Sequence, residues 1–212
     1  MDTSAETRVP SQVPPYPPAP WDLAGQLWMG LFRLQVGEIP VPPRAKRLLG
    51  PRWMLLMVVR YLDGVLRYDE LVFATPIAYA RHYGIWVDRI WVDSEQSLWG
   101  GRRLWGVPKE LARFEWQGDR LAVVDTGGHI ATLMMDTSPA RLPEAPLVAP
   151  GIGQIDGQMV VARGQVRGRP GWGGLHITAW TSRFGYCPTA KPVVSLALKP
   201  FQMHLPGAEP LQ

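Results

Sequence analysis

The segment LWGGRRLWGVPKELARFEW, from Leu98 to Trp116, places one lysine among several tryptophans. Lysine is rare in this chain, because of the 22 basic residues the only lysines are Lys46, Lys109, Lys191 and Lys199. Arginine serves surface ion pairs at least as well, but lysine gives up its proton more readily and can then act as an amine. Burial of Lys109 among aromatic rings would favour the neutral amine, which attacks carbonyl groups to form a Schiff base. The residue types alone also fit an ordinary surface lysine on a strand, and both interpretations are open at this point.

The backbone around Lys109 is predicted to hold its side chain in one direction. Val107 precedes a proline and is therefore biased toward an extended conformation, while Pro108 fixes its own φ. If this segment is a strand, Glu110 points away from the side of Lys109. Five of the ten tryptophans lie between residues 86 and 116: Trp86, Trp91, Trp99, Trp105 and Trp116.

Other constellations of polar residues point to no specific chemistry. The histidines have no metal-ligand spacing and the chain has one cysteine, Cys187, so we expect neither a metal site nor an intrachain disulfide. The segment GIGQIDG, Gly151 to Gly157, has the spacing G-x-G-x-x-x-G without a following helical pattern, and it predicts a turn. The net charge of +4 is modest and the basic residues are scattered, so we expect no nucleic-acid partner.

The composition is that of a folded protein, with 46% hydrophobic and 19% charged residues. The N-terminus lacks the pattern of a secretory signal. The most apolar run, Trp53 to Val59, is far shorter than the roughly 20 residues that span a bilayer. We therefore expect a cytoplasmic protein with no membrane partner. Residues 1–20 hold six prolines and are predicted to form a flexible arm, followed by a single domain over residues 21–212.

Frequent glycines and prolines separate short apolar runs, which predicts a mainly β fold (a β-rich α+β class). Strands are predicted at Gln26–Val36, Trp53–Tyr61, Glu70–Ala74, Ile85–Val92, Arg113–Trp116, Arg120–Val124, His129–Asp136, Gln158–Arg167, Leu175–Ser182 and Val193–His204. Hairpin turns are expected at Gly118–Asp119 and Gly127–Gly128. A first short helix is predicted around Arg44–Leu49, and a second after Ser94, which would cap it, with Gly100–Gly101 limiting its length. These elements predict an antiparallel β-barrel or cone with two or three short helices.

The lysine segment resembles the active-site segment of the acetoacetate decarboxylase family. In that family an apolar strand ends in an aspartate, and a short helix leads to Gly-Arg, an aromatic residue, a small residue and Pro-Lys. The matching residues are Asp93, Gly101, Arg102, Trp105, Gly106, Pro108 and Lys109. Upstream, YDELVFATP resembles the family's Tyr-x-Glu strand and aligns Glu70 with its active-site acid, and VVSLALKPFQMHLP resembles the closing strand.

The resemblance implies a largely antiparallel barrel in which Lys109 is the Schiff-base lysine and Glu70 its acidic partner. It also implies substrate-binding roles for Trp105, Arg102 and Arg33, with no cofactor. Family decarboxylases usually carry a second lysine after the first, and this chain has Glu110 there. No acid occurs in the run Trp53 to Val59, where a second pocket glutamate would fall, and this favours an apolar substrate.

We therefore expect an acetoacetate decarboxylase-like enzyme, a carbon–carbon lyase that forms a Schiff base with a β-keto acid or related carbonyl substrate. The reaction would be a decarboxylation or related aldol, dehydration or hydrolytic chemistry. Two alternatives are a non-catalytic barrel that binds an apolar small molecule and an assembly protein whose aromatic surface builds an oligomer. The resemblance also implies a homo-oligomer.

Overall fold

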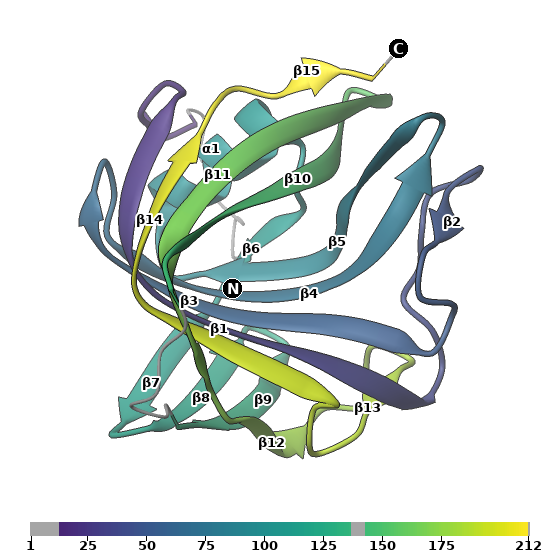
Figure 1. The fold of residues 1–212 in the computed structure, drawn as a ribbon, viewed down its shortest axis with the longest axis vertical. Coiled ribbons are helices and arrows are strands. Elements are labelled where there is room, and N and C mark those ends of the chain that lie inside the picture. Colours follow the sequence, from purple (N-terminus) through teal and green to yellow (C-terminus); the bar gives the residue numbers. More distant parts are fainter. Residues whose placement is uncertain (1–12, 137–142, 212) are drawn as a thin grey trace, which may run out of the picture.

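Figure 1 shows the fold in a computed structural model, which describes residues 13–136 and 143–211. This part of the chain contains fifteen strands and one helix. In chain order they are β1 (Trp21–Val36), β2 (Lys46–Arg47), β3 (Trp53–Gly64), β4 (Tyr68–Tyr79), β5 (His82–Val92), α1 (Glu95–Trp105), β6 (Lys109–Leu111), β7 (Arg113–Gln117), β8 (Arg120–Asp125), β9 (Gly128–Met135), β10 (Ala145–Ile155), β11 (Gln158–Trp172), β12 (Leu175–Trp180), β13 (Cys187–Pro188), β14 (Val194–Leu205) and β15 (Glu209–Pro210).

Seven strands close into a barrel. Their order is β4, β3, β1, β14, β11, β10 and β5, and β5 pairs back with β4. Every neighbouring pair in this ring is antiparallel except β10 with β5. The short strand β6 follows the helix α1 and pairs in parallel with the second half of β5. The predicted fold class, a mainly β protein built on a barrel, is confirmed.

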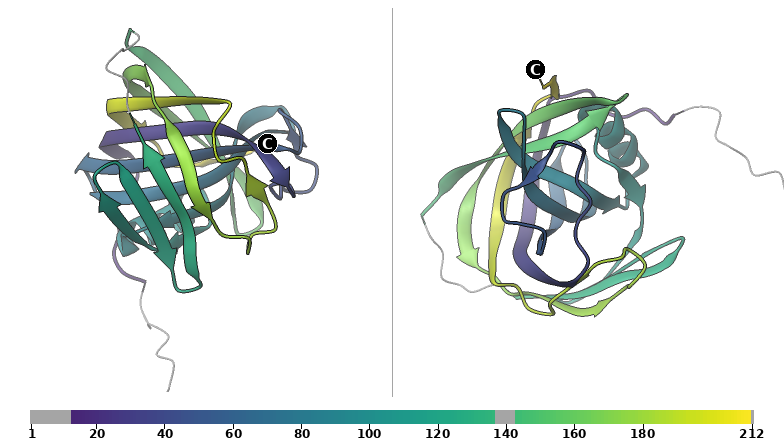
Figure 2. Two further views of the ribbon diagram at one scale, coloured as in Figure 1. Left: turned by 90° about the horizontal axis from the view of Figure 1, so that it is seen from below. Right: turned by 90° about the vertical axis from the view of Figure 1, so that its right-hand side faces the viewer.

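A second sheet, in the order β12, β9, β8 and β7, packs against the outside of the barrel (Figures 1 and 2). Side chains alternate between the two faces of a strand. On β3, Met54, Leu56 and Val58 are fully buried against this second sheet, in a core that also contains Leu121 and Leu133. The intervening residues of β3 therefore point into the barrel.

All ten predicted strands are present, and both predicted hairpin turns join strands of the second sheet. The strand β10 was not predicted, because its sequence APLVAPGIGQI contains glycines and prolines that weaken a strand pattern. Its pairing with β11 and β5 determines its conformation. The predicted turn over Gly151–Gly157 is correct only at Asp156 and Gly157, which have positive φ between β10 and β11.

The helix predictions are correct in one case and wrong in the other. No helix forms around Arg44–Leu49: Lys46 and Arg47 make the two-residue strand β2, which pairs with β4. The helix after Ser94 is present, with the Ser94 side chain accepting a hydrogen bond from the Ser97 amide. Gly100–Gly101 do not end it, because both lie inside α1, which ends at Gly106 in the left-handed conformation.

The described part of the proline-rich arm lies against α1. The Trp21 indole donates a hydrogen bond to the carbonyl of Pro17, and Gln96 of α1 donates one to the carbonyl of Pro15. Residues 1–12 of the predicted arm lie outside the described residues. Within the described ranges, no helix is long and apolar enough to cross a membrane.

Candidate active site

Lys109 and Glu70 form a buried ion pair. The Lys109 Nζ lies 2.8 Å from the Glu70 Oε2, and the two side chains are 5% and 9% exposed. Strand β5 holds both residues in place, because Glu70 of β4 pairs with Val92 on one side of it and Lys109 of β6 pairs with Ile90 on the other. Residues that are far apart in the sequence thus meet inside the barrel.

Two further oxygens surround the ammonium group of Lys109. Its Nζ donates hydrogen bonds to the Ser97 Oγ at 2.9 Å and the Tyr68 hydroxyl at 3.5 Å. The ammonium also lies 4.9 Å from the centre of the Tyr68 ring, a cation–π contact. Together with Glu70, these groups provide one acceptor for each of the three ammonium protons.

Two tyrosines flank the carboxylate of Glu70. The Tyr61 hydroxyl donates a hydrogen bond to the Glu70 Oε1 at 3.5 Å, and the Tyr61 and Tyr68 rings lie 4.5 Å apart. Burial raises the pKa of both tyrosine hydroxyls well above its usual value, and the negative charge of Glu70 adds to the shift. Both phenols are therefore proton donors rather than phenolates near neutral pH.

Sequence reasoning did not identify Ser97, Tyr61 or Tyr68 as site residues. A signal existed for two of them. Tyr68 precedes Glu70 by two residues, which places both on one face of a strand. Ser97 precedes Gly101 by four residues, which places both on one face of the helix. For Tyr61 the sequence contains no such spacing to Glu70. Tyr61 reaches Glu70 because β3 pairs with β4.

The two glycines of α1 make room for the site. A Cβ atom on Gly101 would lie 2.4 Å from the Lys109 Cδ, so the aliphatic stem of the lysine lies directly against this glycine. A Cβ atom on Gly100 would lie 2.5 Å from the Trp21 ring. The pair of glycines therefore allows α1 to approach both Lys109 and the first strand of the barrel.

Arg102 and Trp105 hold the lysine segment from outside the polar cluster. Arg102 is exposed, and its Nε donates a hydrogen bond to the backbone carbonyl of Lys109 at 2.7 Å. Trp105 is buried, and its indole donates a hydrogen bond to the carbonyl of Pro206 at 2.7 Å. Its ring packs edge-on against Trp21, with the centroids 4.7 Å apart. The predicted substrate-binding roles of Arg102 and Trp105 stay predictions.

Arg33 is not brought to the cluster. Its guanidinium lies over the ring of Trp53, 5.3 Å from the centroid. Glu70 pairs with Val59 of β3, which in turn pairs with Leu27 of β1. Arg33 lies six residues farther along β1, about 20 Å from Leu27. Glu110 is exposed, as the alternation of side chains on β6 predicts.

In the part of the chain that the structure describes, no group of three or more His, Cys, Asp or Glu side chains is placed to hold a metal ion. The chemistry available at this site is that of a lysine amine beside a carboxylate, with tyrosine and serine hydroxyls next to them.

Residues 48–149, which include Glu70, Ser97 and Lys109, match the family model described as acetoacetate decarboxylase. A solved acetoacetate decarboxylase superposes with a TM-score of 0.70 at 18% identity, covering 98% of this chain and 95% of that one. The enzyme from Legionella pneumophila gives a TM-score of 0.65 at 18% identity, covering 98% and 93%. The enduracididine biosynthesis enzyme MppR, complexed with pyruvate, gives 0.59 at 14% identity, covering 96% and 93%. No curated protein matches the chain.

The barrel, the helix beside it and the buried lysine–glutamate pair thus occur on a fold shared with these enzymes. The expected resemblance is confirmed: residues 48–149 match the acetoacetate decarboxylase family model, and the chain shares the fold of solved acetoacetate decarboxylases.

Proposed function

We propose that this protein is a Schiff-base enzyme in which Lys109 condenses with the ketone of a β-keto acid or a related carbonyl compound. The observation that carries the proposal is the Lys109–Glu70 pair, a lysine amine within 2.8 Å of a proton acceptor in a nearly closed site. An amine that only balanced a surface charge would gain nothing from such burial.

Glu70 supplies the first proton transfer. The ammonium of Lys109 cannot attack a carbonyl, and the Glu70 Oε2 is the acceptor best placed to take its proton. The neutral Nζ then bonds to the ketone carbon and forms a carbinolamine. Glu70 returns its proton to the hydroxyl group of the carbinolamine, which leaves as water, and the product is a protonated imine on Lys109.

The protonated imine accepts electrons when carbon dioxide leaves. The bond between the carboxylate and the adjacent carbon breaks, its electron pair forms the carbon–carbon double bond of an enamine, and the imine nitrogen becomes neutral. Protonation of the enamine carbon gives a new imine, and water releases the ketone and restores Lys109. Each step transfers protons among the amine, the carboxylate and water, and no oxidant is required.

Tyr68 and Ser97 position the amine in this scheme. The Tyr68 hydroxyl contacts the Nζ from β4, and the Ser97 hydroxyl contacts it from α1. These two contacts restrict the direction from which the amine meets a carbonyl. Because the raised pKa keeps the Tyr68 hydroxyl protonated, it can donate a hydrogen bond to the departing hydroxyl group.

A second candidate is a barrel that binds an apolar small molecule without turnover. It is favoured by the hydrogen bonds from the Lys109 Nζ to Glu70, Ser97 and Tyr68, which engage all three protons of the ammonium group. In this alternative the pair would be a structural feature of the barrel.

Exchange of the ketone oxygen separates the two candidates. Imine formation and hydrolysis replace the ketone oxygen with one from water, whether or not carbon dioxide is lost. We expect an ¹⁸O-labelled ketone to lose its label in the presence of the protein and not with the Lys109→Arg variant. Retention of the label at the uncatalysed rate with every ketone tested, together with reversible ligand binding, would favour the binding barrel.

A further inference from the structure

The interior wall of the barrel beyond Lys109 is apolar. Paired residues on neighbouring strands face the same side of a sheet. One row of paired residues leads from Lys109 through Ile90 and Val72 to Met57 and Met29. The ion pair therefore lies at one end of a wall whose side chains are otherwise hydrocarbon or thioether.

The two neighbouring rows have the same character. On one side of the lysine row, Glu70 is paired with Val92 and Val59, and Val59 is paired with Leu27. The row on the other side consists of Leu31, Leu55, Ala74 and Val87. Successive rows are two residues apart, so the wall extends about 7 Å from one row to the next.

On β1 and β3 this wall is less tightly sealed than the outer face of the same strands, whereas Ile90 and Val72, between Lys109 and Met57, are buried. On β3, Met57 and Leu55 point inward and are only partly buried, whereas their outward neighbours Leu56 and Val58 are fully buried against the second sheet. On β1, Met29 is likewise partly buried while its neighbours are covered. Inward-facing apolar side chains that stay accessible indicate space beside them inside the barrel.

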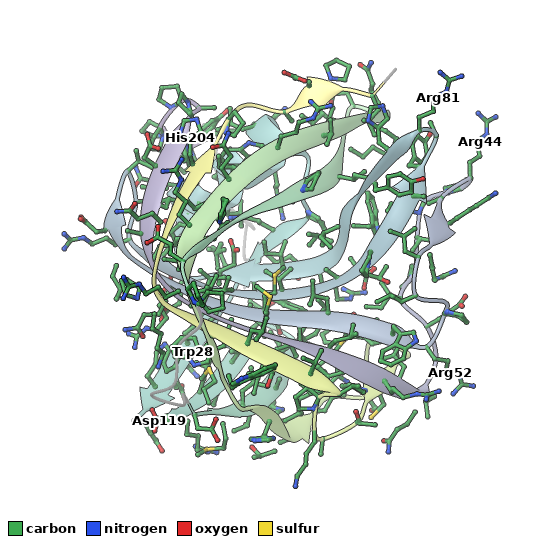
Figure 3. The ribbon with its side chains drawn as sticks, in the orientation of Figure 1. Trp28, Arg44, Arg52, Arg81, Asp119 and His204 are labelled. Atoms are coloured by element: carbon green, nitrogen blue, oxygen red, sulfur yellow. The ribbon has the colours of Figure 1, made fainter. Side chains whose placement is uncertain are left out.

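Among the described residues that form these three rows, Lys109 and Glu70 are the charged ones. Lys109 is already paired with Glu70 at 2.8 Å. The arginines labelled in Figure 3 at the far end of the barrel, Arg44, Arg52 and Arg81, lie at the outer rim rather than along the interior rows. A substrate that extends from Lys109 along the wall therefore contacts apolar side chains.

We propose that the carbonyl substrate of Lys109 carries an alkyl chain or aryl ring on the ketone carbon, and that this group lies against Met57, Met29 and Leu55. The substrate class is thus an apolar ketone or 3-oxo acid rather than a small, highly charged keto acid. Met57 is the central specificity-determining residue, because it lies in the row of Lys109 and next to that of Leu55. This inference rests on the proposed Schiff-base function.

A series of methyl ketones of increasing chain length tests the proposal. Each ketone is trapped on the protein with borohydride, and the concentration that gives half-maximal labelling is measured. Burial of one methylene group corresponds to about a fourfold gain in affinity. We expect the half-maximal concentration to fall by about that factor per added methylene from acetone onward, until the wall is covered.

Met57 variants test whether this wall is responsible. Met57→Gln places a polar group of similar length on the wall, and we expect it to flatten the chain-length dependence while acetone is still trapped. Met57→Ala removes side-chain volume and should shift the preference to longer or branched ketones, so it tests the same position if the glutamine variant does not fold. Leu62→Gln, at an exposed position of β3, is the matched control and should behave as the unchanged protein.

The outcomes separate this inference from the function on which it rests. Equal labelling by acetone and the longer ketones, or tighter labelling by pyruvate, would overturn the apolar substrate class and leave the Schiff-base function intact. An unchanged chain-length dependence in both Met57 variants would overturn the assigned wall. No adduct with any ketone would overturn both proposals.

Discussion

Gly101 lies directly against the side chain of Lys109: a Cβ atom on the glycine would approach the Lys109 Cδ to 2.4 Å. The contact joins the middle of α1 to the first residue of β6. It explains why a helix interior contains a residue that costs about 1 kcal/mol relative to alanine. The space that the lysine stem needs inside the barrel is available because this helix residue has no side chain.

We predict that Gly101→Ala displaces Lys109 and reduces imine formation at least tenfold. Alanine is the better helix former, so any loss of activity should not be accompanied by a loss of the helix. The measurements are ketone oxygen exchange and circular dichroism. Gly151→Ala is the matched control, because a Cβ atom at this strand glycine has open space around it. Normal exchange in the Gly101 variant would show that the contact does not position the amine.

Removing one member of the buried pair should be more destabilising than removing both. Lys109→Met leaves the carboxylate of Glu70 nearly closed off from water and unpaired, which typically costs about 3–5 kcal/mol of unfolding free energy. The double variant Lys109→Met/Glu70→Gln should recover part of this loss. Urea unfolding of the single and double variants measures the difference. A double variant less stable than the single one would contradict the view that the unpaired charge is the cause.

Alkaline pH should destabilise the protein through its buried tyrosines. The pKa values of Tyr61 and Tyr68 are raised in the folded state, mainly by burial, while unfolded tyrosine titrates near 10. Above about pH 10 the unfolded chain loses these protons and the folded chain keeps them, so the unfolding free energy falls as the pH rises. Below that pH the contribution is fully present.

Tyr68→Phe removes one of these groups, and we expect a shallower alkaline loss of stability in this variant. Unfolding free energies measured over the alkaline range test this directly. The tyrosinate absorbance near pH 10 is then compared between the folded protein and the folded variant. A difference would contradict the prediction, since it would mean that Tyr68 ionises without unfolding.

Self-association also stays a prediction. Trp172, Val193 and Val194 are exposed to 57%, 62% and 44%, and clustered exposed apolar side chains commonly mark protein interfaces. Analytical ultracentrifugation at micromolar concentration should detect an oligomer. A monomer at all such concentrations would remove the prediction.

Local sequence patterns predicted ten of the fifteen strands in the described residues, and also the direction of Lys109. Short apolar runs between glycines and prolines predicted those ten, whereas the two- or three-residue strands β2, β6, β13 and β15 have no such run. The Val-Pro-Lys segment and the exposed Glu110 followed from backbone restriction and alternation. Strand β10 could not be predicted in this way, because its residues pair as a strand only once β11 and β5 are present on either side.

The partners of Lys109 required knowledge of the strand pairing. Glu70 was identified through a family resemblance, whereas Tyr61 reaches it only because β3 and β4 pair in one register. Ser97 lies in the first turn of α1 and meets the lysine because this helix packs beside β6. Arg33 was predicted for the site, but register places it about 20 Å along β1 from the row of Glu70.

Borohydride trapping with peptide mapping tests the central claim most directly. The protein is incubated with a methyl ketone, reduced, digested and analysed by mass spectrometry. We predict a reduced adduct on the peptide containing Lys109, dependent on the ketone and absent from the Lys109→Arg variant, with Lys46, Lys191 and Lys199 unlabelled. Labelling that spreads over the other lysines, or that leaves Lys109 unmodified with every ketone, would contradict a catalytic amine at this position.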